Sequence, residues 1–137
     1  MEERRFSPGS YGDYSGVVFY GPPQGGFWED RFAISNQYVV PLFSSLYLSA
    51  RDGDASAPRL IVEWWNGQGW TGVSGIVEIP REDLAHLIAA LARLSADELA
   101  PRCDVIGPDR CMEAAVALRK FLAEHSSRGT PVFIETE

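Results

Sequence analysis

One apolar stripe, in residues 80–95, constrains the fold more than any other feature of the sequence. In the segment PREDLAHLIAALARLS, leucine or isoleucine stands at positions 84, 87, 88, 91 and 94, which is the spacing of a single helix face. Pro80 suits the first turn of a helix, and Glu82 and Asp83 favour the positive end of its dipole. The segment predicts an amphipathic helix that covers an apolar layer.

A second helix is expected from near Pro108 to about His125. Its apolar face is formed by Cys111, Ala115, Leu118 and Leu122, together with His125. The sequence RGTP ends the helix, and VFIE then reads as a terminal strand that can return to the sheet.

Before these helices the pattern is that of short strands and turns. Asn66-Gly67, in NGQG, is typical of a tight hairpin turn, because Asn and Gly tolerate a positive φ angle. The expected strands are GVVFYG (16–21), FWEDRFAIS (27–35), QYVVPLF (37–43), SSLYLSAR (44–51), RLIVEWW (59–65) and WTGVSGIVEI (70–79).

The predicted fold class is α+β, with an antiparallel β-sheet followed by two helices that pack on one face. Residues 1–137 form a single domain. Within it, residues 1–45 are a Gly/Pro/aromatic β-rich segment, residues 46–94 a hairpin sheet plus helix, and residues 95–137 a second helix and terminal strand.

Charge and composition restrict the partners. The formal net charge is −7, from 19 acidic and 12 basic residues, and no segment is basic. Nucleic-acid backbones are bound by clustered Lys and Arg, so the balance favours a basic protein partner.

With no apolar run of about 20 residues and no signal-peptide pattern, we expect a cytoplasmic protein that does not enter membranes. Cys103 and Cys111 are then expected as reduced thiols.

No catalytic or metal-binding pattern is present in the sequence. His86 is expected on the solvated side of its helix, and His125 near a helix C-terminus, where an imidazolium interacts well with the dipole. The two cysteines lack the spacing of a zinc module. The prediction is a non-enzymatic protein with no metal and no cofactor, and an enzyme of an unfamiliar type stays as a lesser alternative.

The stretch EWWNGQGW holds the best candidates for a binding surface. On a strand, Trp64 and Trp65 point to opposite faces, and Trp64 shares the more apolar one, so it is expected in the core. Trp65 and Trp70 are then expected on the other face or at the turn. Whether that face is open or covered by the aromatic N-terminal segment is undecided by the sequence. Large aromatic residues are enriched in interface hot spots.

The run from Leu46 to Leu94 resembles the sheet-then-helix unit of the PC4-like single-stranded-DNA-binding family. The resemblance is carried by hairpin-joined strands and by the strand-to-helix text GIVEIPREDLAHLIAALARL, Gly75 to Leu94. It implies a homodimer and a curved sheet on which Trp65, Trp70 and Arg59 bind a single strand. The strands of this unit carry more acidic than basic residues, which departs from the family's basic surface.

Two functions follow as hypotheses. The first is a non-catalytic acidic domain that engages a basic protein, such as an immunity-type inhibitor that neutralises a toxin or nuclease. Its partner-binding residues are predicted to be Trp65, Trp70, Glu63 and Asp54. The second is a PC4-like single-stranded nucleic-acid-binding protein, with Trp65, Trp70 and Arg59 as the contact residues.

Overall fold

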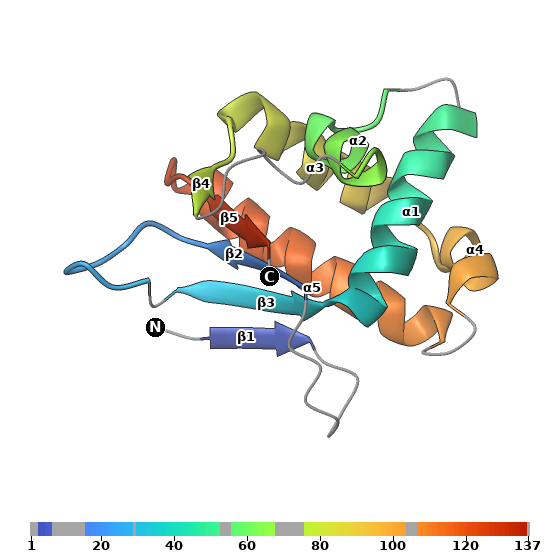
Figure 1. Cartoon of the computed structure of the whole chain (residues 1–137), viewed down its shortest axis with the longest axis horizontal. Coiled ribbons are helices and arrows are strands. Elements are labelled where there is room, and N and C mark those ends of the chain that lie inside the picture. The colour runs from blue at the N-terminus through green and yellow to red at the C-terminus, as the bar shows by residue number, and fades with distance from the viewer. Residues whose placement is uncertain are drawn as a thin grey trace.

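The computed structural model of the chain describes residues 3–6, 16–28, 30–52, 56–67, 76–103 and 107–136. The strands are β1 (Glu3–Phe6), β2 (Gly16–Tyr20), β3 (Arg31–Ser35), β4 (Val77–Glu78) and β5 (Phe133–Thr136). The helices are α1 (Asn36–Asp52), α2 (Arg59–Trp65), α3 (Arg81–Arg93), α4 (Ala96–Leu99), the 3₁₀ turn η1 (Ala100–Arg102) and α5 (Pro108–Ser127). The predicted α+β class is confirmed (Figure 1).

The strands form one sheet in the order β1-β3-β2-β5-β4. β3, β2, β5 and β4 pair antiparallel, as predicted, whereas β1 joins β3 in parallel. The terminal strand returns to the sheet and lies between β2 and β4, so strands from both ends of the chain meet in its middle.

The helices supply the core on one face of the sheet. Phe19 of β2 and Phe32 of β3 are fully buried, and the Phe32 ring lies 5.8 Å from that of Phe121 on α5. α5 runs behind the sheet in Figure 1. On the opposite side of β2, Val18 and Tyr20 are also buried, so both faces of this strand are covered.

The segments expected as strands at 37–43 and 44–51 form the single helix α1 instead. Its fully buried positions follow a helical repeat, with Tyr38 and Val39 one turn before Leu42 and Phe43. Alternating apolar residues fit a strand locally, but burial of this repeat against the sheet and the other helices decides the conformation. Pro41 lies inside the helix.

The expected strand at 59–65 is also wrong, because these residues form α2. β-Branched and aromatic residues predict a strand, but Leu60, Ile61 and Trp64 have the i, i+1, i+4 spacing that buries one helix face. Gly67, expected in a hairpin turn, instead ends α2 with φ +71°, and its N–H donates to the carbonyl of Trp64 at 3.1 Å. A positive φ angle is needed in either role.

The two predicted helices are confirmed as α3 and α5, and β2 confirms the strand expected at 16–21. Of the strand expected at 27–35, only Arg31–Ser35 forms β3, and Phe27 lies in the preceding turn. Of the strand expected at 70–79, the described part is β4, and residues 70–75 lie outside the described residues. Over its described residues, the strand-to-helix sequence that carries the PC4 resemblance forms a strand, β4, followed by a helix, α3. The preceding strands that the resemblance requires are the helices α1 and α2.

Candidate functional site

The predicted contact residues that the structure describes lie on the short helix α2. Trp65, Glu63 and the alternative nucleic-acid contact Arg59 all belong to it. Trp70 and Asp54 lie outside the described residues. The three placed residues are brought together, but on a helix rather than on the strands that the sequence predicted.

The two adjacent tryptophans have different surroundings, as the sequence predicted. Trp64 packs edge-on against the buried ring of Phe43, at a centroid distance of 5.5 Å and an interplanar angle of 89°. Trp65 lies flat on Tyr47 of α1, with the centroids 4.4 Å apart and the planes within 4°. We call this pair the Tyr47–Trp65 stack. Trp65 is 39% exposed, so an ordered aromatic surface reaches the solvent.

Acidic groups lie beside the stack on the other side of α2. A pocket of about 160 Å³ is lined by Glu63 of α2, Glu78 of β4 and Asp83 of α3. Glu63 accepts a hydrogen bond from Nε of Arg59 at 3.2 Å, so this arginine is locally neutralised. The pocket therefore carries more negative than positive charge, and its remaining walls are apolar.

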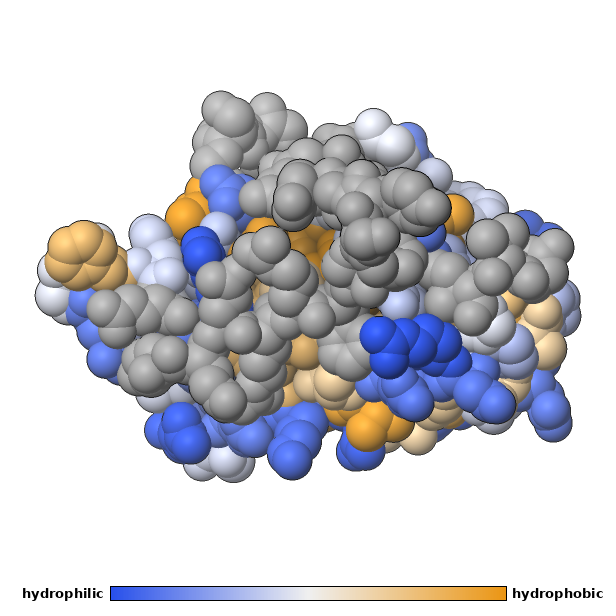
Figure 2. Space-filling model, turned by 90° about the horizontal axis from the view of Figure 1, so that it is seen from below, coloured by the Kyte–Doolittle hydropathy of each residue, from blue (hydrophilic) through white to orange (hydrophobic). Residues whose placement is uncertain are grey.

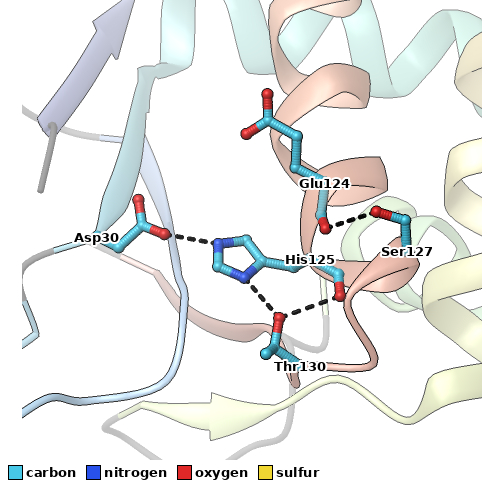
Figure 3. A network of polar contacts seen from close by, with 5 residues as sticks. All are labelled: Asp30, Glu124, His125, Ser127 and Thr130. Atoms are coloured by element: carbon cyan, nitrogen blue, oxygen red, sulfur yellow. Dashed lines mark hydrogen bonds and ion pairs between the residues drawn. The ribbon is translucent and has the colours of Figure 1, made fainter.

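A buried polar network ties the β2–β3 hairpin to the end of α5 (Figure 3). Nε2 of His125 lies 2.7 Å from Oδ2 of Asp30, and Nδ1 lies 2.8 Å from Oγ1 of Thr130. The Thr130 hydroxyl donates its one proton to the carbonyl of His125 at 3.0 Å, so Oγ1 accepts from the ring. Both ring nitrogens are therefore bonded within the network, Nε2 to the Asp30 carboxylate and Nδ1 to the Thr130 hydroxyl.

This network joins two parts of the fold that are far apart in the sequence. The His125 ring is buried, and both of its nitrogens are bonded to groups of the chain itself. The sequence identified His125 as a helix-end residue but missed Asp30, which lies 95 residues away and has no local motif. Only the strand pairing that places Asp30 beside α5 reveals it.

Among the described large hydrophobic side chains, Phe27 is the most exposed, at 67%, and it follows the Gly25-Gly26 turn. It stands at the β2–β3 turn without the support that Tyr47 gives to Trp65. Figure 2 shows the molecule from below, where the coloured residues along the lower rim are mainly hydrophilic. The ordered stack is therefore the better candidate for a contact surface.

Within the described ranges, no three His, Cys, Asp or Glu side chains are grouped so as to hold a metal ion. No helix in the described part of the chain has the length and apolar character to span a bilayer.

Comparison of the chain with protein-family models, with curated proteins and with solved structures finds no match. The candidate site therefore depends on the geometry of these residues alone.

Proposed function

We propose that the chain is a non-catalytic binding domain that engages a basic protein through the Tyr47–Trp65 stack. The observation that carries this proposal is the flat, partly exposed arrangement of Trp65 on Tyr47. An aromatic side chain held in one orientation loses little conformational entropy on binding, and tryptophan and tyrosine dominate interface hot spots.

Charge supports a basic partner. The chain has a net charge of −7, and the pocket lined by Glu63, Glu78 and Asp83 is formed in part by the same short helix that carries Trp65. A helix of 7 residues is about 10 Å long, whereas a standard interface covers about 800 Å² on each partner. A partner surface of this size is wide enough to extend from the aromatic stack around α2 to the acidic pocket. Neutralisation of a basic toxin or nuclease is one activity of this kind.

The test compares the intact chain with two variants as bait. Trp65→Ala removes the stack, while Phe27→Ala removes an exposed aromatic at the β2–β3 turn, away from α2 in Figure 1. A basic protein that is captured by the intact chain and by Phe27→Ala is then purified. We expect its Kd for Trp65→Ala to rise by at least about 30-fold, as for a hot-spot residue of about 2 kcal/mol.

Folding of each variant is checked by its melting temperature. A folded Trp65→Ala protein that binds the purified partner as tightly as the intact chain would refute the proposal. The single-strand alternative is tested separately by titrating tryptophan fluorescence with oligonucleotides at low salt. Quenching that is lost in Trp65→Ala and weakened steeply by salt would favour nucleic acid over a protein partner.

A further inference from the structure

A second pocket, distinct from the acidic one, lies between the C-terminal halves of α1 and α3. It has a volume of about 300 Å³, which is the lower end of the range for small-molecule sites. Its apolar walls come from two helices and from the segment that leads into α2: they are Leu46, Ala50, Pro58, Ala90 and Leu94. Leu46, Pro58 and Leu94 are themselves buried, so the floor of the pocket is continuous with the core.

One wall of this pocket is held in place by a specific bond. Nε2 of His86, on α3, lies 3.0 Å from the carbonyl oxygen of Ser56 and donates to it, because a carbonyl can only accept. His86, expected from the sequence as a solvated residue, thus fixes residues 56–58 against α3. The pocket is bounded by an anchored segment rather than by a loosely placed one.

Two charged side chains line the pocket, and only one of them is already bonded. Oε1 of Glu98 accepts hydrogen bonds from the N–H and the hydroxyl of Ser95, as part of the capping box of α4. Arg93, in the last turn of α3, forms no hydrogen bond or ion pair with any of the described residues. The Glu98 carboxylate keeps its negative charge beside these neutral donors, and the Arg93 guanidinium is the charged group of this pocket whose hydrogen-bond donors are not used by the described residues.

We infer that this pocket binds a small apolar carboxylate, with the hydrocarbon part on the Leu46–Leu94 floor and the carboxylate on the Arg93 guanidinium. A guanidinium presents paired N–H donors that match the two oxygens of a carboxylate. The hydroxyls of Ser49 and Ser56 also line the pocket as further polar groups. A free carboxylic acid and the C-terminal residue of a peptide share this chemistry.

The inference is tested by titrating the full chain, labelled with ¹⁵N, and following its backbone amide resonances. The probes are isocaproate and its neutral analogue isocaproamide, and acetyl-Gly-Gly-Leu with a free or an amidated C-terminus. We expect saturable shifts at the pocket residues with a carboxylate probe and none with its neutral analogue. Binding of isocaproate identifies a free acid as the ligand, and binding of the free-carboxylate peptide alone identifies a chain terminus.

Three variants separate the roles of the pocket residues. Arg93→Gln should weaken binding roughly tenfold or more, because it removes a charge-assisted hydrogen bond. Ser49→Leu, which fills the partly exposed mouth, should abolish it, whereas Arg51→Gln, an exposed arginine on α1 outside the pocket, should leave it unchanged. The inference is overturned if neither carboxylate binds, if the neutral analogues bind equally well, or if either Arg93→Gln or Ser49→Leu binds as tightly as Arg51→Gln.

Discussion

At the scale of single residues, the two cysteines show how burial controls reactivity. Both are buried free thiols, Cys103 in the connector before α5 and Cys111 on α5. Burial, and then a hydrogen bond with Cys103, raise the pKa of Cys111 to about 12. The nucleophilic form of cysteine is the thiolate, so Cys111 is protonated and inert throughout the neutral range.

We predict that iodoacetamide at pH 8.5 modifies Cys111 in the denatured chain but not in the folded one, as measured by mass spectrometry of peptides. In the unfolded chain the Cys111 thiol ionises near pH 8.5, whereas in the folded chain its pKa is about 12. The contribution of this thiol to the free energy of unfolding is therefore fully present below about pH 8.5 and is lost as pH rises towards 12. Cys111→Ser identifies the modified site. Rapid labelling of the native protein at Cys111 would contradict the prediction.

At the scale of elements, the contact between the β2–β3 hairpin and α5 depends on the absence of a side chain at Gly21. A Cβ atom there would lie 2.6 Å from Cε1 of His125 and 3.0 Å from Oδ2 of Asp30. Gly21 is not among the described glycines with positive φ, so an alanine meets a steric obstacle and no backbone strain. The buried His125 ring cannot retreat into solvent.

We predict that Gly21→Ala lowers the free energy of unfolding by about 1–3 kcal/mol, the usual cost of overpacking. The measurement is urea denaturation. A double-mutant cycle supplies the control: in a His125→Ala background, where the ring is gone, the same substitution should cost much less. Equal costs in the two backgrounds would show that the hairpin and α5 do not meet through this contact.

The elements also show where sequence reasoning succeeded. α3 and α5 were predictable because their apolar stripes are long and strictly periodic, and β2, β3 and β5 because they are short β-branched or aromatic runs bounded by turn residues. α1 and α2 were not, since their local composition favours strands and only burial of residues such as Leu42, Leu60 and Ile61 selects the helix.

Some features of the candidate site were also predictable from the sequence, and others were not. The separate surroundings of Trp64 and Trp65 were predictable, but for a different reason: neighbouring residues diverge on a helix as well as on a strand. The stacking of Trp65 on Tyr47 was not, because it requires α1 and α2 to be packed together. No sequence pattern indicated that Arg93 lines a pocket either, because the pocket is assembled from segments that are distant in the sequence.

At the scale of the whole molecule, the net charge of −7 governs how the proposed partner is reached. Opposite net charges accelerate diffusional encounter, whereas desolvated aromatic contacts mainly set the rate of dissociation. Charge and the Tyr47–Trp65 stack should therefore act on different rate constants.

We predict that raising the salt concentration from 50 to 500 mM slows association with the basic partner by roughly tenfold, as measured by stopped-flow tryptophan fluorescence. Trp65→Ala should instead raise the dissociation rate and leave the salt dependence of association unchanged. An association rate that is independent of salt would argue against a basic partner.

The position of β5 has a consequence for how the chain acquires its fold during synthesis. β5 lies between β2 and β4, and its Glu135 accepts a hydrogen bond from Tyr20, 115 residues earlier. A ribosome releases β2 long before it has made β5, so one hydrogen-bonding edge of β2 stays unpaired until β5 has emerged. The nascent chain therefore passes through a stage that invites pairing with other strands, and only its last described residues close that edge.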